Sequence, residues 1–294
     1  MRVGGHTSDP CRICGAAADD AGSIRRATGA TFLLRRCPDC GYAFVLNPLE
    51  DSGRVYDERY YRGLGADPHV DYLFELERPD STVRRLEWQG ILDVVRNLVP
   101  LGPGVRWLDY GCGNGGLVRH LLASGACQAT GFETGWIADR ARALGIPLLG
   151  EAEFGAATGQ FDVVTAIEVV EHLVDPLQFF RAVRGLLKPG GLLFLTTGNA
   201  ARHPDLTRWS YVVPEIHVSF FEARTVERAL RMTGFRAESR GLLPGFEKII
   251  GFKILKRLGV RRYNRALDAL PWRPISRFVD ARLSLTAHPV GWAV

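Results

Sequence analysis

The chain has 294 residues, of which 46% are hydrophobic and 23% are charged, and its formal net charge is +5. This size and apolar content predict one main domain with a large core and an accessory piece. No run of 18 apolar residues occurs, which excludes a transmembrane helix. The opening MRVGGHTSDP lacks the apolar centre of a signal peptide, so we expect a cytoplasmic protein.

Positive charge is concentrated near the C-terminus. The segment 240–282 contains eleven Lys or Arg residues and only three acids, so the rest of the chain is slightly acidic. The basic character therefore belongs to the C-terminal part and not to the centre of the chain.

Four of the six cysteines form two C-x-x-C pairs, and 22 residues separate the pairs. Each pair is followed by Gly, which lets the chain curl around a bound ion, and strand-like segments follow at 31–35 and 42–46. The pattern predicts a zinc ribbon over residues 1–50, with a closed and structural four-thiolate site. A redox role is the lesser alternative. The predicted metal ligands are Cys11, Cys14, Cys37 and Cys40.

Residues 51–100 are interpreted as a helical connector. Tyr56 and Tyr60 share one face of an expected helix over 54–62, which either covers a ligand or packs on the main domain. Asp67-Pro68 breaks the chain, and a helix is expected over 84–98. The Pro/Gly cluster 100–104 marks the boundary before the first core strand.

Strands and helices alternate through residues 101–240. This alternation predicts an α/β fold, a doubly wound and mostly parallel sheet that binds its ligand at the carboxyl ends of the strands. Asp175 is the expected N-cap of the third helix in the list that follows. The expected strands are 105–108, 129–133, 146–149, 161–167, 192–196 and 235–240, and the expected helices are 117–122, 137–144, 176–187 and 225–233.

A glycine-rich turn follows the first core strand. Gly111, Gly113 and Gly116 satisfy G-x-G-x-x-G, which leaves a dinucleotide open as the ligand. Asp109 argues against a pyrophosphate, because a carboxylate repels it. The same acid favours a ligand with an ammonium and a sulfonium group, such as S-adenosylmethionine (SAM). Glu133, at the end of the second strand, can accept hydrogen bonds from the ribose of either ligand.

The glycine turn and two further segments together favour SAM over a dinucleotide. Asp109, Gly111, Gly113 and Gly115 fit D-x-G-x-G-x-G, and the stretches FDVVTAIEVVEHL (161–173) and LKPGG (187–191) follow at suitable distances. Over residues 105–197 the chain therefore resembles the class I SAM-dependent methyltransferases, which implies a Rossmann-like fold.

That resemblance also implies the cofactor contacts. Glu151 is expected to lie near the adenine amine of the cofactor. The alternative is that Glu151 lies on the solvated surface. The cysteine pairs before the core resemble those of enzymes that methylate sugars and other small metabolites, whose Tyr-rich segment assigns Tyr60 to the cofactor. The implied cofactor-binding residues are Asp109, Gly111, Cys112, Gly113, Glu133, Thr134, Glu151, Glu168 and Tyr60.

The sequence E-x-x-E-H, formed by Glu168, Glu171 and His172, also resembles the quinone-pathway O-methyltransferases, in which these groups can bind Mg²⁺. The favoured alternative has Glu168 contacting the cofactor while the other two shape the loop. His172 is a candidate general base, because its unperturbed pKa suits neutral pH.

Residues 204–221 form a long insertion that is expected to shape the acceptor site. His217 in this insertion is the second candidate base, and a packing role for His217 is the alternative.

The C-terminal segment 241–294 is predicted to be a basic lid or interface. A helix over 246–258 places Phe246, Ile249, Ile250, Ile254 and Leu258 on its apolar face, with its lysines opposite. A lid or dimer interface is the first interpretation, and peripheral membrane contact through 246–265 or nucleic-acid contact are the alternatives. A last strand is expected at 290–294.

These observations predict a SAM-dependent methyltransferase that acts on a small-molecule acceptor, with oxygen as the first guess for the methylated atom. An RNA methyltransferase that uses the ribbon and the basic C-terminus is the alternative, and nucleic acid is not the expected partner because no N-P-P-Y-type motif follows the 161–167 strand. A non-catalytic scaffold of the same fold also stays open. The acceptor, the base and the oligomeric state are left open.

Overall fold

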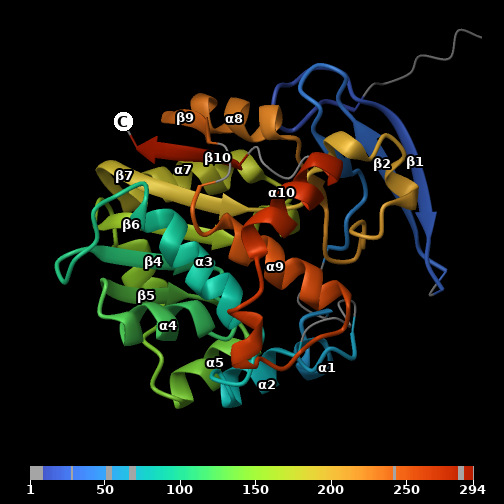
Figure 1. Cartoon of the computed structure of the whole chain (residues 1–294). Coiled ribbons are helices and arrows are strands. Elements are labelled where there is room, and N and C mark those ends of the chain that lie inside the picture. The colour runs from blue at the N-terminus through green and yellow to red at the C-terminus, as the bar shows by residue number, and fades with distance from the viewer. Residues whose placement is uncertain are drawn as a thin grey trace, which may run out of the picture.

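The computed structural model describes residues 9–27, 29–50, 55–65, 71–240, 243–283 and 288–293. The predicted chain break at Asp67-Pro68 lies outside these residues. Two sheets organise the described chain, and the larger one forms the centre of the molecule (Figure 1).

The central sheet has six strands, and its core is parallel. β5, β4, β6 and β7 are hydrogen-bonded in parallel, whereas β10 runs antiparallel to both of its neighbours, β7 and β9. The predicted doubly wound, mostly parallel sheet is therefore confirmed. In spatial order the strands are β5 (Gln128–Phe132), β4 (Arg106–Tyr110), β6 (Phe161–Ile167), β7 (Leu187–Thr196), β10 (His288–Ala293) and β9 (Phe235–Arg240).

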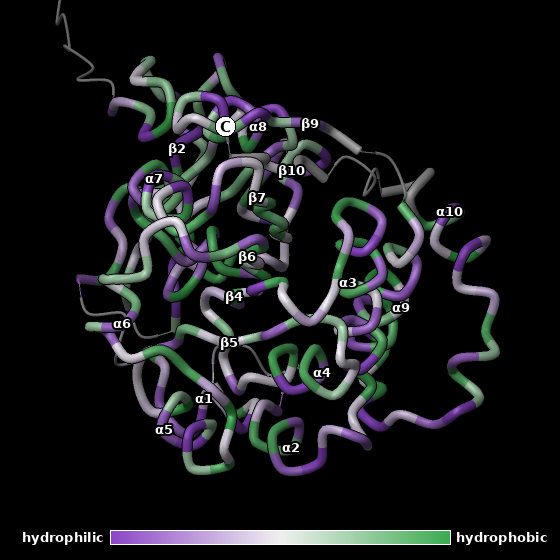
Figure 2. Tube along the Cα trace, turned by 90° about the vertical axis from the view of Figure 1, so that its left-hand side faces the viewer, coloured by the Kyte–Doolittle hydropathy of each residue, from purple (hydrophilic) through white to green (hydrophobic). Residues whose placement is uncertain are grey.

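Helices cover both faces of this sheet. Figure 2 shows α3 (Arg85–Arg96), α4 (Gly116–Ser124) and α9 (Phe246–Arg257) on one side and α7 (Pro176–Leu186) on the other. The start of α7 follows from its sequence, because the Asp175 side chain accepts a hydrogen bond from the Gln178 N–H. The remaining helices of four or more residues are α1 (Glu58–Tyr61), α2 (Tyr72–Glu77), α5 (Trp136–Ala143), α6 (Glu151–Gly155), α8 (Ala223–Met232) and α10 (Trp272–Leu283).

Three predicted elements differ from the structure. Residues 146–149 make only one isolated bridge, Gly131 to Leu148, because Pro147 has no N–H to continue a ladder. β7 begins at Leu187, so LKPGG is the start of a strand and not only the end of a helix. The expected helix over 54–62 is reduced to α1, which leaves Tyr56 outside it.

The ribbon is joined to the rest of the molecule by its sheet. The strands β1 (Asp19–Arg25), β2 (Thr31–Arg36) and β3 (Ala43–Val45) are followed in that sheet by β8 (Ser219–Phe220), which comes from the 204–221 insertion. The Tyr42 hydroxyl lies 2.6 Å from the hydroxyl of Ser219, and both residues are fully buried. The ribbon thus fixes the end of the insertion in which His217 lies.

The C-terminal helix α9 packs against α3 and α10. Its buried side chains correct the predicted apolar face, because Leu258 is 72% exposed and Ile254 is only half-buried. Lys253, expected among the outward-facing lysines, lies on the inner side. The apolar side chains buried under α9 are Phe246, Ile249, Ile250, Phe252 and Leu255.

These buried side chains contact other helices and are not presented to a membrane surface. In the described ranges, no helix is long and apolar enough to cross a membrane. The last expected strand is present as β10, whose register pairs Val290 with Phe194 of β7.

Candidate functional site

The glycine turn lies between the carboxyl end of β4 and the start of α4. Gly111, Gly113 and Gly115 have φ values of 68°, 53° and 72°, a region that L-residues with a Cβ rarely adopt. A Cβ on Gly113 would meet no atom closer than 3.9 Å, so the backbone there is open to a ligand. This geometry fits the close approach of a nucleoside to the turn.

Glu133 connects the turn to the end of β5. Its carboxylate accepts hydrogen bonds from the N–H groups of Gly113 at 2.9 Å and of Thr134 at 2.8 Å. Burial raises the pKa of Glu133, and the two backbone hydrogen bonds oppose that effect. The carboxylate is thus held beside the glycine turn, where a ribose would present its hydroxyls.

Asp109 is the buried acid beneath the turn. Its side chain is 4% exposed and accepts a hydrogen bond of 2.7 Å from the hydroxyl of Thr165 on β6. Burial raises the pKa of Asp109 to about 7, although the Thr165 hydrogen bond lowers it. A nearby cation would favour the ionised form, which is the property expected of a site for a sulfonium ligand.

Of four other predicted cofactor residues, two are buried and two are exposed. The Cys112 thiol is buried and faces Gly131, so only the backbone of Cys112 is available to a ligand in the turn. Thr134 is exposed and uses its N–H for Glu133. Glu151 is exposed at the first position of α6, and Tyr60 is buried in an aromatic cluster with Tyr56, Tyr61 and Tyr72.

The segment after β6 lies directly against the glycine turn. A Cβ on Gly111 would be 2.7 Å from a methyl group of Val169, so the two segments are in contact. The preceding residue, Glu168, has a φ of 55°, which is unusual for a residue that is not glycine. Unusual backbone conformations of this kind are common at functional sites, so the φ of Glu168 supports its place in the site.

Glu168 collects donors from three separate parts of the chain. Its Oε1 accepts a hydrogen bond of 3.0 Å from Thr196 and lies 3.2 Å from Nζ of Lys253, and its Oε2 accepts one of 3.3 Å from the Tyr211 hydroxyl. Burial raises the pKa of Glu168, but the charge of Lys253 and the hydrogen bonds from Thr196 and Lys253 together outweigh burial and lower the pKa to about 2. Glu168 is therefore ionised.

The adjacent acid, Glu171, is fully buried. It accepts hydrogen bonds of 2.6 Å from the Tyr211 hydroxyl and 2.9 Å from the Thr197 hydroxyl. Burial raises the pKa of Glu171, and the negative charge of Glu168 raises it further. Tyr211 thus contacts two carboxyl groups whose pKa values are shifted in opposite directions, that of Glu168 downward and that of Glu171 upward.

Both candidate bases lie in this region, with ring centroids 4.9 Å apart. Nδ1 of His217 is 2.6 Å from the Tyr211 carbonyl oxygen, which can only accept, so Nδ1 carries the proton and Nε2 carries the lone pair. Nδ1 of His172 is 3.0 Å from the Ile216 carbonyl and 2.8 Å from the Tyr56 hydroxyl. Burial lowers the pKa of His172, which keeps it neutral near pH 7.

The structure adds residues that the sequence did not assign to the site. Tyr56 reaches His172 from the connector, Tyr211 lies between the two acids, and Lys253 enters from α9. The helical period could have identified Lys253, because it is seven residues after Phe246 and so shares the inner face of the helix. The Tyr-rich segment 54–62 already offers Tyr56 as a residue that covers a ligand, and Tyr211 falls in the insertion expected to shape the acceptor site. Neither pattern indicates the contact of Tyr56 with His172 or of Tyr211 with the two acids.

Two groups of side chains could hold a metal ion, within the part of the chain that is described. In the first group, Sγ of Cys11 lies 3.5 Å from Sγ of Cys40. Sγ of Cys14 likewise lies 3.5 Å from Sγ of Cys37. The edge of a tetrahedral zinc–thiolate site is about 3.8 Å, so this cluster fits zinc.

The second group consists of Glu171, His172 and His217, whose ligand atoms lie within 4.8 Å of one another. The Mg²⁺ set that the sequence offers as the less favoured interpretation contains Glu168 in place of His217. In the structure the Glu168 carboxylate is instead paired with Lys253. Both oxygens of Glu171 already accept hydrogen bonds from hydroxyl groups.

A family model for a methyltransferase domain matches residues 69–240, which is more than half of the chain. The chain belongs to this family. The prediction of a class I SAM-dependent methyltransferase is thereby confirmed. The match contains the glycine turn, Glu133, both acids of E-x-x-E-H and both candidate bases, but it ends before α9 and Lys253.

Curated relatives of the methyltransferase domain share its central part. The ubiquinone biosynthesis O-methyltransferase of Xanthomonas campestris pv. campestris (strain B100) is 38% identical over 118 residues, covering 37% of this chain and 48% of that protein. The enzyme of the same description from Pseudomonas aeruginosa (strain LESB58) is 36% identical over 111 residues, covering 33% and 45%. The chain therefore spans about half the length of the curated relatives it matches.

A solved structure supports the fold. The solved complex of the Haloferax volcanii Trm112 methyltransferase activator contains a chain that is 17% identical, with a TM-score of 0.51. The similarity covers 83% of this chain and 97% of that chain. At this identity the similarity shows the fold alone.

Proposed function

We propose that the protein transfers the methyl group of SAM to a hydroxyl oxygen of a small-molecule acceptor. The observation that carries this proposal is the contact between Gly111 and Val169, which brings the glycine turn against the segment that contains Glu168, Glu171 and His172. A donor site and a cluster of acids and histidines thus meet at one edge of the sheet, as methyl transfer to oxygen requires.

On the donor side, the chain contributes position and charge. The backbone of Gly111 and Gly113 accommodates the nucleoside, Glu133 accepts hydrogen bonds from the ribose, and Asp109 favours a cationic ligand in the turn. SAM supplies a methyl group that is already activated by the positive charge of its sulfonium. The main task of these residues is therefore alignment.

On the acceptor side, we assign the general base to His217. Its Nδ1–H is fixed on the Tyr211 carbonyl, and its ring stacks on that of Tyr211 with centroids 4.4 Å apart. The orientation of the imidazole is thereby set, and Nε2 can take the proton of an acceptor hydroxyl as the new oxygen–carbon bond forms. His172, held by Tyr56, lines the same space.

The proposed specificity for oxygen draws on the two relatives, which are ubiquinone biosynthesis O-methyltransferases. A hydroxylated aromatic compound is thus the first acceptor class to test, and a sugar hydroxyl is the second. The stacked aromatic side chains of Trp209 and Tyr211 in the insertion, with centroids 4.9 Å apart, suit an aromatic acceptor.

We further propose that the four cysteines hold a structural zinc ion. The neighbouring thiol of Cys40 lowers the pKa of Cys11 to about 5 by a hydrogen bond, so one thiolate forms readily in the cluster. All four positions are thiols, which leaves no open coordination site for catalysis. Metal analysis of the purified protein should find about one zinc per chain.

The proposed activity is tested with the purified full chain, isotopically labelled SAM, and three acceptors in parallel: protocatechuate, a nucleotide sugar and total RNA. We expect label in the oxygen-methylated catechol and a mass increase of one methyl group. Label only in RNA would replace this proposal by the RNA methyltransferase. SAM binding without label in any acceptor would contradict the proposed acceptor classes, and absence of SAM binding would support the non-catalytic scaffold.

A further inference from the structure

Lys253 lies on the inner face of α9, and its ammonium group is close to two carboxylates. Its Nζ lies 3.2 Å from Oε1 of Glu168 and 3.4 Å from Oε1 of Glu87, whose side chain is 2% exposed. Glu87 belongs to α3, so Lys253 links the C-terminal helix to the connector and to the site. Neither Lys253 nor the rest of α9 is part of the matched family region.

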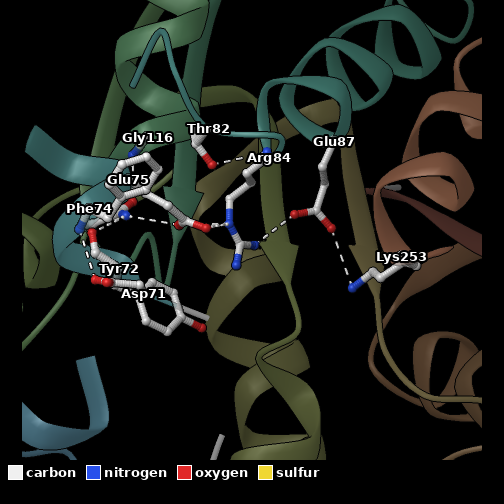
Figure 3. Close-up of polar contacts among 10 residues, drawn as sticks. Asp71, Tyr72, Phe74, Glu75, Thr82, Arg84, Glu87, Gly116 and Lys253 are labelled. Carbon is white, nitrogen blue, oxygen red and sulfur yellow. Dashed lines mark hydrogen bonds and ion pairs between the residues drawn. The ribbon is translucent and has the colours of Figure 1, made fainter. Parts of the chain in front are cut away.

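The ion pair continues toward the glycine turn (Figure 3). The Arg84 guanidinium lies between Glu87 and Glu75, with contacts of 2.8 Å to both carboxylates. Glu75 also accepts a hydrogen bond of 3.2 Å from Asn114, which is inside the turn itself. The acids of this chain of charges are held by Arg84, which pairs with both of them, and Lys253 contacts only the end far from the turn, at Glu87.

From Lys253, a second set of contacts reaches the proposed base. Lys253 pairs with Glu168, Glu168 accepts from the Tyr211 hydroxyl, and the Tyr211 carbonyl accepts from His217. Each step is a direct contact between charged or polar groups. The position of His217 thus depends on a carboxylate whose cationic partner comes from α9.

The docking of α9 on α3 is fixed at the start of α9. A Cβ on Gly90 of α3 would lie 2.7 Å from the Gly245 carbonyl oxygen, and Gly245 has a φ of 107°. The two helices therefore approach at a point where only glycine fits. Lys253 follows two turns later on the same face of α9.

We infer that Lys253 is a positioning residue of the methyltransferase: it holds Glu168 in place and, through Tyr211, fixes the 204–221 insertion that contains His217. This inference rests on the proposed function, because it gives the C-terminal segment a part in that same site. The segment completes the acceptor side, and the glycine turn does not need it for SAM.

The test compares Lys253→Met with Lys248→Met. Lys248 is the matched control, because it also joins α9 to α3, through Asp93 at 2.6 Å, but does not reach Glu168. We expect Lys253→Met to lower kcat by about 10- to 100-fold with an unchanged Kd for SAM. Lys253→Arg should recover most of the loss, and Lys248→Met should match the wild type.

A double variant examines whether Lys253 acts through Glu168. In a Glu168→Gln background, Lys253→Met should cause less than a twofold further loss, because the two residues form one unit. Two additive losses would overturn the proposed route.

Hydrogen exchange gives a readout that does not need activity. Amides of the 204–221 insertion should exchange about tenfold faster in Lys253→Met than in Lys248→Met, while those of the glycine turn should not change. Equal exchange in the two variants overturns the inference even if the wild type methylates an acceptor. If the wild type methylates none of the acceptors, the proposed function fails, and the exchange comparison still decides the role of Lys253.

Discussion

The proposed donor side and the proposed acceptor side of the site are built in different ways. The donor side comes from one continuous stretch, from Asp109 to Thr134, in which backbone conformation and two acids define the site. The acceptor side is assembled from distant segments of the chain, which contribute Tyr56, Glu168, Tyr211 and Lys253. The motif of a local site indicates most of its contacts. For a site assembled by tertiary contacts, the sequence indicates single residues, such as Glu168 and His217, but not the contacts that join them.

The comparison has a functional consequence. The family match contains the whole donor side but ends at residue 240, before Lys253. Variants on the donor side should therefore change SAM binding, and variants on the acceptor side should change methyl transfer with SAM binding intact.

The largest expected effect concerns the ribbon that supports the acceptor side. Cys37→Ser should remove the zinc and lower the stability of the 204–221 insertion through β8, at a cost of several kcal/mol. Thermal unfolding and zinc content measure this effect. Cys127→Ser is the control, because Cys127 is a buried cysteine outside the cluster. A Cys37→Ser protein with wild-type Tm and no zinc would show that the ribbon does not need metal.

The second effect concerns the base. His217→Asn should reduce kcat by about 100- to 1,000-fold, because the acceptor hydroxyl loses the group that we propose takes its proton. Steady-state kinetics with the methylated acceptor measures this loss. His172→Asn provides the comparison, and a larger loss in that variant would transfer the role of base to His172.

The third effect belongs to the donor side. Glu133→Ala should weaken SAM binding by about 100-fold, or roughly 3 kcal/mol, because two hydrogen bonds to a charged group are lost. Calorimetric titration with SAM measures the change. Glu151→Ala is the control, because Glu151 is exposed at the start of α6. If Glu151→Ala weakens binding as much as Glu133→Ala, the adenine contact expected from the resemblance is supported.

The smallest expected effect is on the stability of the SAM-free protein and concerns Asp109. The folded-state pKa of about 7 lies above the ordinary value of 3.8, so this carboxyl destabilises the fold increasingly as pH rises from about 4 to 7. Asp109→Asn should therefore stabilise the SAM-free protein by on the order of 1–2 kcal/mol above pH 7 and by almost nothing near pH 4.

Thermal unfolding across this pH range measures the gain, and SAM titration of the same variant should show weaker binding. A variant that is less stable than the wild type at pH 8 would contradict the assigned cost of burying Asp109.

The sequence predicts much of the fold because its signals are local. The apolar run 161–167 is found as β6 with the same limits, and Asp175 caps α7 as expected. The expected strand at 146–149 failed because Pro147 interrupts the ladder, a cost that the apolar pattern does not show.

The residues of the candidate site also fall into those with a local sequence signal and those without one. Glu133 and the glycines could be assigned because their spacing reflects one βα unit. The charge of Lys253 predicts an outward position, whereas the helical period places it on the inner face of α9. The pairing of β8 with the ribbon depends on residues more than 170 positions apart, which no local pattern can indicate.

The most direct test of this division is a single-turnover measurement on His217→Asn that has been saturated with SAM. The account predicts that SAM binds with wild-type affinity and that methyl transfer to the acceptor is slowed by about 100-fold or more. Methyl transfer at the wild-type rate, or a parallel loss of SAM affinity, would contradict the separation of a donor side from an acceptor side.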